Sequence, residues 1–273
     1  MNNEYIEINI AVADEDLRSQ LVAQLNAIGF YGFEEDDHSL KAYIKAGELN
    51  EPELNNLLNR YNLNYSLSNI SDKNWNEVWE SNFQPVVVDD FVGIRAGFHA
   101  PMTGVEHEII ITPKMSFGTG HHATTWLVMQ LMRELDFNGK TVFDFGTGTG
   151  ILAILAKKLG AKLVLAGDND PWCIENASEN ISNNNCNNIE IQQIESAELN
   201  HQFEIILANI NRHIILANLN FLYKALAPCG ELVLSGLLID DEKDICEAAF
   251  ASGFRHLKTV QRNGWIAIRL FKE

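Results

Sequence analysis

The stretch TVFDFGTGTG at Thr141–Gly150 decides the fold, and the apolar run ILAILA at Ile151–Ala156 follows it directly. The pattern predicts a buried strand, a glycine-rich turn and the start of a helix, in that order. Glycines let the chain turn sharply and let a ligand approach the backbone without a Cβ in the way. Free amides at the start of a helix favour electron-rich ligand atoms. The turn, with Gly146 and Gly148, therefore predicts a site for a nucleotide-like ligand.

Strands and helices alternate from residue 123 onward. After a helix at Ala123–Leu135, strands are predicted at Thr141–Phe145, Leu163–Asp168, Glu190–Gln193, Phe203–Ala208 and Glu231–Ser235. Short strands precede this region at Val86–Val88, Val92–Ala96 and Glu108–Thr112, and an antiparallel edge pair closes it at Phe254–Gln261 and Trp265–Phe271. Such alternation is typical of an α/β fold, here a doubly wound Rossmann-like domain with helices on both faces of a mostly parallel sheet. We place this domain at residues 85–273.

The first 70 residues predict a smaller α+β domain. Residues 4–12 alternate apolar and polar side chains, which is the period of a half-buried strand. The other elements are predicted as a helix at 14–29, strands near Phe30–Glu34 and Leu40–Ile44, a helix at 51–61 and a strand near Asn64–Ile70. This β-α-β-β-α-β order is ferredoxin-like, and it places the domain at residues 1–70. Aromatic and apolar residues at helical spacing then predict a linker helix over residues 71–84.

The chain is strongly acidic, with 20 Lys and Arg against 37 Asp and Glu and a net charge of −17. Tight binding to a phosphate backbone relies on clustered cations, so a nucleic-acid partner is not expected. A small molecule or a basic protein fits this charge better as a substrate. No apolar run approaches the roughly 18–20 residues of a membrane span, and the first residues do not resemble a secretory signal. We expect a cytoplasmic protein with no membrane partner.

No metal site is predicted. The four cysteines are scattered and form no Cys-x-x-Cys pair, which argues against structural zinc and against a disulfide framework. The neighbouring His121 and His122 have no third ligand at a suitable spacing.

Asp168 is the candidate ribose-binding residue. It ends the strand that follows the glycine turn, 18 positions after Gly150. An acid about 20 residues beyond such a turn can accept hydrogen bonds from both ribose hydroxyls. Asp170 fits better as the N-cap of the helix that begins near Pro171. Because dehydrogenases also have these features, the turn and Asp168 leave the cofactor open.

The glycine spacing and Asn209 help to choose between cofactors. A dinucleotide site requires G-x-G-x-x-G, and here Ile151 occupies the position of its third glycine, which disfavours an NAD-dependent oxidoreductase. Asn209 ends the fourth strand of the domain, where side chains face the ligand crevice. Its amide oxygen can accept a hydrogen bond from a substrate amine, while its NH₂ can donate to the cofactor. An alternative interpretation makes Asn209 only a turn residue.

The segment FGTGHHATT at Phe117–Thr125 resembles the signature F-G-T-G-x-H-x-T-T of the bacterial methyltransferases that modify the eleventh large-subunit ribosomal protein. The glycine turn, Asp168, the strand end at Asn209 and the terminal Gly264-Trp265 match that family in order and spacing. The match is sharp over residues 71–273, whereas residues 1–70 match in size and pattern only.

The resemblance implies that S-adenosylmethionine binds at Thr125, Gly146, Gly148, Asp168 and Asn209. It further implies methylation of lysine side chains and the α-amine of that ribosomal protein, with residues 1–70 gripping the substrate. An N-methyltransferase of another protein or of a small-molecule amine is the alternative that shares this catalytic domain.

The segment at Phe117–Thr125 is predicted to cover the cofactor. Phe117 would lie against the apolar side of the cofactor, and Thr124 or Thr125 would cap the following helix. The chain departs from the commonest family pattern at Thr112-Pro113-Lys114, where Asp-Pro-Gly is usual, and at Ala123, where Pro is usual. These departures bear on the shape of this covering segment.

Overall fold

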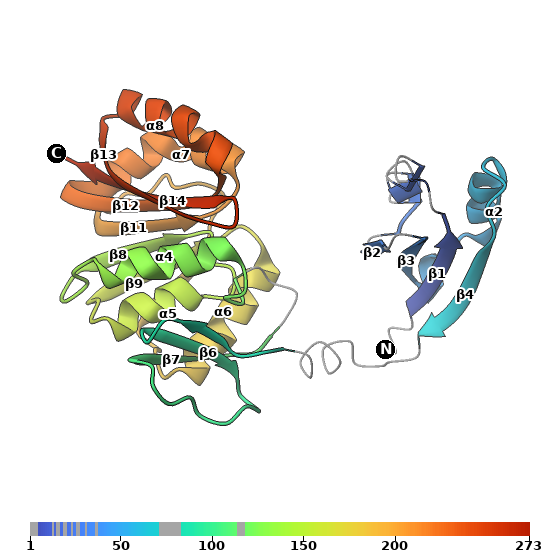
Figure 1. Cartoon of the computed structure of the whole chain (residues 1–273), viewed down its shortest axis with the longest axis horizontal. Helices are drawn as coiled ribbons and strands as arrows, with labels where there is room; N and C mark the ends of the chain where they lie inside the picture. The colour runs from blue at the N-terminus through green and yellow to red at the C-terminus, as the bar shows by residue number, and fades with distance from the viewer. Residues whose placement is uncertain are drawn as a thin grey trace. The chain divides into compact units, whose positions relative to one another are not determined.

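The computed structural model describes residues 5–273 except 13, 15–16, 19–20, 23, 26–27, 31, 36–37, 71–82 and 114–117. The chain divides into two compact units, Met1–Val78 and Trp79–Glu273, which Figure 1 shows in blue and in green to red. The predicted linker helix at 71–84 lies almost wholly outside the described residues, and Phe83 and Gln84 at its end are not helical. Phe117 also lies outside them, so its predicted contact with the cofactor stays a prediction.

The first unit has one antiparallel sheet, in the order β2-β3-β1-β4. Its elements are β1 (Tyr5–Ala11), β2 (Gly32–Glu35), β3 (Ser39–Lys45), the 3₁₀ turn η1 (Ala46–Glu48), α2 (Glu51–Asn59) and β4 (Tyr65–Ile70). The described residues between 17 and 25 are helical. Alternate residues of β1, Ile6, Ile8 and Ile10, are buried in a core shared with Leu54. The ferredoxin-like pattern is confirmed.

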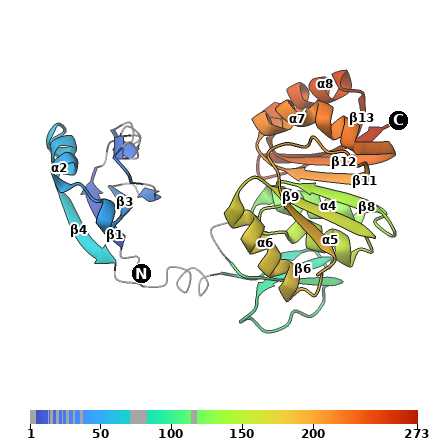
Figure 2. The same cartoon turned by 180° about the vertical axis from the view of Figure 1, so that it is seen from behind.

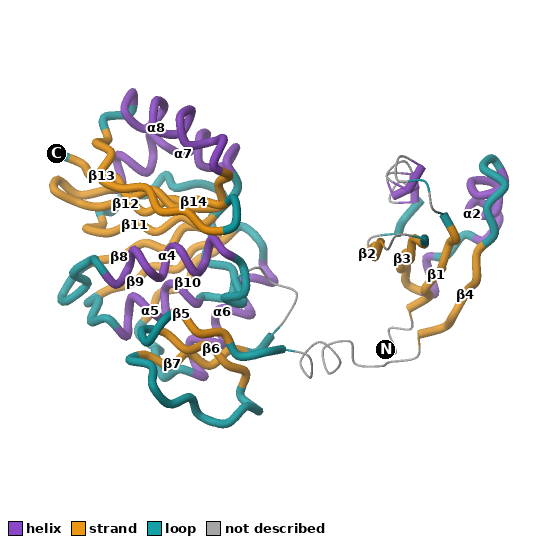
Figure 3. Tube along the Cα trace, viewed as in Figure 1, coloured by secondary structure: helices purple, strands orange, loops and turns teal. Residues whose placement is uncertain are grey.

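The second unit is built on a seven-stranded sheet, in the order β10-β9-β8-β11-β12-β14-β13. The strands are β8 (Thr141–Phe145), β9 (Leu163–Asp168), β10 (Ile189–Gln193), β11 (Phe203–Asn209), β12 (Leu226–Leu238), β13 (Phe254–Arg262) and β14 (Trp265–Lys272). The first five strands run parallel, and β14 pairs antiparallel with both β12 and β13, as predicted. The strand predicted at Glu231–Ser235 is only the central part of β12. Figure 3 shows the strands together in orange.

Helices cover both faces of this sheet, as Figure 1 and the reverse view in Figure 2 show. They are α4 (Ala123–Arg133), α5 (Ile151–Lys158), α6 (Pro171–Asn183), α7 (Arg212–Ala225) and, after the 3₁₀ turn η2 (Ile239–Asp241), α8 (Glu242–Ala251). Alternate residues of each central strand enter two different cores. Val142 and Leu207 pack with residues of α4, α5 and α6, whereas Phe143 and Ile206 pack with residues of α7 and α8. The doubly wound α/β architecture is confirmed.

A separate three-stranded sheet precedes α4. It contains β5 (Val86–Val88), β6 (Val92–Ala96) and β7 (His107–Ile111), in that order, and β6 pairs parallel with β7. Ile94 and Ile109 pack into the core that contains α4 and α5. Within the described part of the chain, no helix is both long and apolar enough to span a bilayer.

Candidate functional site

The carboxyl ends of β8, β9 and β11 lie side by side in the sheet. Residues of β8 pair with both neighbours, Phe145 with Gly167 of β9 and Asp144 with Leu207 of β11. The strand order reverses here, because β9 and β10 lie on one side of β8 while β11 and β12 lie on the other. Ligands of doubly wound sheets bind at such a switch point. The structure therefore brings the glycine turn, Asp168 and Asn209 together, as the sequence predicts.

The glycine turn is held tightly between these strands. The amides of Gly146 and Thr147 both donate to the carbonyl of Gly167, at 2.8 and 2.9 Å. Gly146 has φ 78°, and a Cβ built on it would overlap the Cγ2 of Ile210. Only glycine fits a left-handed backbone with so close a neighbour. The turn is thus fixed by the end of β9 on one side and by the end of β11 on the other.

Asp168 is buried and oriented by the backbone. Its Oδ2 accepts from the amide of Gly148 at 2.9 Å, and its Oδ1 accepts from the amide of Asp170 at 3.1 Å. Each carboxylate oxygen keeps a further lone pair, since a carboxylate can accept about four hydrogen bonds. The carboxylate can therefore take ligand hydroxyls without giving up the turn. Asp170 caps α6 as predicted, because its side chain accepts from the amide of Trp172 at 2.9 Å.

Asn209 joins the end of β11 to α4. It is 8% exposed, and its Nδ2 donates to the Oγ1 of Thr125 at 3.2 Å. Its Oδ1 is buried and has no hydrogen-bond partner among the residues that the structure describes. A buried acceptor without a partner costs about 1–3 kcal/mol, so this oxygen is free for a donor from a ligand. The NH₂ group, predicted to donate to the cofactor, donates to Thr125 in this structure.

The predicted cap of α4 is wrong. The N-cap is His122, whose Nδ1 accepts from the amide of Thr124 at 3.4 Å. Thr124 and Thr125 lie in the first turn of the helix, and both are fully buried. The sequence suggested threonine because its hydroxyl is a common cap, whereas histidine is not. The ring of His122 also makes an edge-on contact with Trp265, at 4.6 Å between centroids.

Asp144 is a buried carboxyl to which the sequence assigned no chemical role. It lies on β8, is fully buried, and its Oδ2 accepts from the Oγ1 of Thr147 at 2.6 Å. Burial, with a smaller contribution from the charge of Asp168, raises its pKa to about 7, although the hydrogen bonds from Thr147 and from the backbone of Ala153 act in the opposite direction.

Asp144 should make stability depend on pH. Its pKa in the folded state lies above the value of about 3.9 in an unfolded chain, so its contribution falls as the pH rises from about 4 to about 7. An asparagine at this position cannot ionise. The free energy of unfolding of Asp144→Asn, relative to that of the wild type, should therefore be about 2 kcal/mol higher at pH 8 than at pH 5. Urea denaturation of both proteins at the two pH values measures this difference. A constant difference would show that Asp144 titrates normally.

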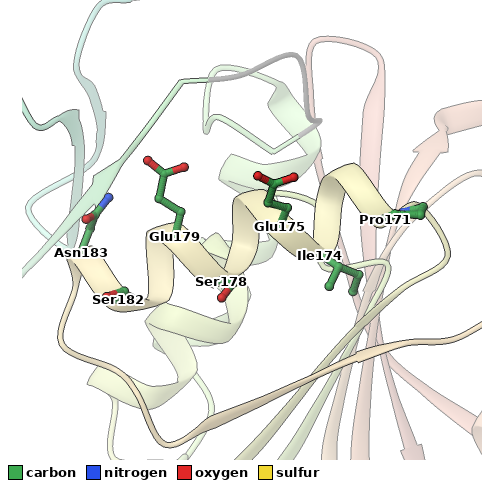
Figure 4. A pocket seen from close by; sticks show the side chains of 7 residues that line it. All are labelled: Pro171, Ile174, Glu175, Ser178, Glu179, Ser182 and Asn183. Atoms are coloured by element: carbon green, nitrogen blue, oxygen red, sulfur yellow. The ribbon is translucent and has the colours of Figure 1, made fainter.

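A shallow groove runs along the outer side of α6. It holds about 570 Å³ and is lined by Pro171, Ile174, Glu175, Ser178, Glu179, Ser182 and Asn183, which Figure 4 shows. All lining residues belong to α6, so the groove is not the crevice at the three strand ends. Among the described residues, no group of three or more His, Cys, Asp or Glu side chains could hold a metal ion.

A mostly parallel sheet with a glycine turn at its switch point, Asp168 at the next strand end and a buried asparagine at the fourth strand end defines a class I methyltransferase. The comparisons with known proteins agree. The profile of the family described as Ribosomal protein L11 methyltransferase (PrmA) matches residues 2–273, and the chain belongs to this family.

Relatives of the same name are similar over almost their whole length. The ribosomal protein L11 methyltransferase of Phocaeicola vulgatus is 37% identical over 97% of this chain and 98% of its own. That of Porphyromonas gingivalis is 40% identical over 91% of this chain and 89% of its own. The crystal structure of a ribosomal protein L11 methylase from Lactobacillus delbrueckii subsp. bulgaricus covers 70% of this chain and 100% of its own, with a TM-score of 0.65 and 29% identity.

Proposed function

We propose that the chain transfers methyl groups from S-adenosylmethionine to amines of ribosomal protein L11. The observation that carries the proposal is the buried Oδ1 of Asn209, which has no partner among the described residues and stands at the switch point of the sheet. Family membership supports both the reaction and the substrate.

The residues at the strand ends fit the cofactor. Asp168 has lone pairs for the ribose hydroxyls, and Gly146 and Gly148, both with positive φ, form the turn beside it, where the amide of Gly148 donates to its carboxylate. Thr125 and Asn209 are already hydrogen-bonded to each other, so they would act as one polar unit near the reacting groups. When bound, S-adenosylmethionine supplies an electrophilic methyl group on a sulfonium.

Asn209 orients the nucleophile. Its neutral amide oxygen accepts an N–H of the substrate amine, which aims the remaining lone pair of the nitrogen and places no charge beside it. The free lysine amine has a pKa near ~10.4, and its removal from water on binding would help it to lose a proton. The side chain thus orients the neutral amine, which is the form that reacts, without adding a charge that would stabilise the ammonium.

A net charge of −17 favours a basic protein as the substrate. The acceptors are lysine side chains and the α-amine, and the unit of residues 1–70 recognises the substrate. The enzyme acts in the cytoplasm, without direct contact to nucleic acid or membrane.

The experiment is mass spectrometry of L11 purified from cells with and without this protein, together with transfer of tritiated methyl groups to purified L11. We expect additional masses in multiples of a methyl group only when the enzyme is present. Label on other proteins or on a small amine, with L11 unmodified, would favour the alternative substrate. Tight binding of a nicotinamide dinucleotide in a fluorescence titration would favour the oxidoreductase instead.

Asp168→Ala tests the ribose contact. Removing the carboxylate should weaken binding of S-adenosylmethionine by about 1.5–3 kcal/mol, the scale of a hydrogen bond to a charged group. Isothermal calorimetry measures the affinity, and Asp170→Ala is the matched control because Asp170 only caps α6. Equal affinities of the wild type and Asp168→Ala would remove Asp168 from the binding site.

A further inference from the structure

Three buried asparagines form a row along α6 and its C-cap. Asn176, Asn180 and Asn184 are spaced by four residues, and they are 0%, 0% and 8% exposed. Residues four apart lie above one another on a helix, so the three amides face the same way. A buried amide costs free energy unless it is hydrogen-bonded, which makes the partners of this row informative.

The row binds the free edge of β7. The Oδ1 of Asn184 accepts from the amide of Ile110 at 2.9 Å, and its Nδ2 donates to the carbonyl of Ile110 at 2.6 Å. The Oδ1 of Asn180 accepts from the amide of Thr112 at 2.7 Å, and the Nδ2 of Asn176 donates to the carbonyl of Thr112 at 3.3 Å. Since β6 pairs with the other edge of β7, the asparagine amides take the place of a missing strand.

The side chain of Thr112 is bound to the same helix. Its Oγ1 donates to Glu179 at 2.8 Å and accepts from the Nδ2 of Asn183 at 3.3 Å. Figure 4 shows Glu179 and Asn183 on one side of α6. Thr112 is therefore fixed to α6 by its amide, its carbonyl and its hydroxyl.

Thr149, the last residue before the N-cap glycine of α5, connects this row to the glycine turn. Its carbonyl accepts from the Nδ2 of Asn180 at 2.8 Å. Its Oγ1 donates to the carbonyl of Gly118 at 2.7 Å. A Cβ on Gly118 would lie 2.9 Å from that Oγ1, so the two segments are in close contact. Gly118 is thus hydrogen-bonded to Thr149 directly, and Thr112 is linked to Thr149 through the side chain of Asn180.

We propose that Asn180 and Thr149 are positioning residues for cofactor binding. They hold the glycine turn in the conformation that binds the cofactor. They also fix the positions of Thr112 and Gly118, two residues of the segment between β7 and α4. Neither side chain needs to touch the cofactor, because both act through the backbone of the turn. The proposal rests on the proposed function, since it assumes that the turn binds S-adenosylmethionine.

The experiment measures the affinity of the full chain for S-adenosylhomocysteine by calorimetry, and the midpoint of thermal unfolding for each variant. Thr149→Val keeps the shape of the side chain and removes the bond to Gly118, whereas Thr149→Ser keeps the hydroxyl. Asn180→Asp removes the donor to Thr149 and keeps an acceptor for Thr112. Asn184→Asp is the matched control, because Asn184 donates to Ile110 and to the carbonyl of Asn180 and makes no hydrogen bond to the turn.

We expect Thr149→Val and Asn180→Asp each to weaken binding about tenfold, as the loss of one buried hydrogen bond predicts. Thr149→Ser should restore most of the affinity, and Asn184→Asp should lower the unfolding midpoint without changing the affinity. Because both residues act on one turn, the double variant should lose less than the product of the two single losses.

Two results would overturn the proposal. One is an unchanged affinity in Thr149→Val and Asn180→Asp; the other is an equal loss in Asn184→Asp, which would indicate a general effect of stability. If the wild-type chain itself did not bind S-adenosylhomocysteine, the proposed function would fail instead, so the two failures are distinguishable.

Discussion

Asn209→Ala is expected to lower kcat for methylation of L11 by about 100- to 1,000-fold, the effect of removing one preorganised hydrogen-bonding group from an active site. The reason lies in the buried Oδ1, which has no partner among the described residues and can be satisfied by the substrate amine. The alanine variant also leaves Thr125 without its bond from Nδ2. Rates with tritiated cofactor at saturating substrate measure the loss.

Asn209→Asp separates orientation from charge. A carboxylate next to the substrate amine stabilises its protonated form, which has no lone pair for the transfer. We therefore expect the pH profile of kcat for Asn209→Asp to move to higher pH, with partial recovery of the rate in alkaline buffer. A profile that keeps the wild-type midpoint would show that Asn209 does not face the amine.

Asn218→Ala is the control for both variants of Asn209. Asn218 is also buried, and its side chain makes hydrogen bonds to the backbone of Ala197 and Ile214. These hydrogen bonds have a structural role. Its loss should lower the stability of the second unit and leave kcat of the folded enzyme unchanged. If Asn218→Ala reduced kcat as strongly as Asn209→Ala, the effect of Asn209 would have to be assigned to packing.

Much of the second unit can be predicted from sequence because its central strands are short, apolar and followed by glycine or acid. The bounds of β8 and β9 agree with the structure residue for residue. The strand ends that carry Asp168 and Asn209 follow from the same pattern, since the carboxyl ends of neighbouring parallel strands meet at one edge. A residue at the carboxyl end of its strand is therefore expected in the candidate site.

Contacts between distant segments could not be predicted in this way. The row of asparagines on α6 looks in sequence like the polar side of a surface helix, yet Asn176 and Asn180 are completely buried. Their partners at Thr112 and Thr149 lie 64 and 31 positions away in the chain. The spacing of four residues was the available signal. It becomes meaningful only when the free edge of β7 is known to pack beside the helix.

Removing residues 1–70 should abolish efficient methylation of L11 while leaving cofactor binding intact. The two units have separate hydrophobic cores, one formed by residues such as Ile8 and Leu54 and the others by residues from Phe83 onward. A second binding module on the same chain raises the overall affinity for a partner about 10²- to 10⁴-fold, so kcat/KM for L11 should fall by that factor. The rate with L11 at concentrations below KM measures the change.

The cofactor provides the control for this truncation. The glycine turn, Asp168 and Asn209 all belong to the second unit, so the shortened chain should bind S-adenosylhomocysteine with the affinity of the full chain. Intact cofactor binding with a low kcat/KM for L11 would then assign recognition of the protein substrate to the first unit. Normal methylation of L11 by the shortened chain would mean that the second unit selects its substrate alone, through the surface around its strand ends.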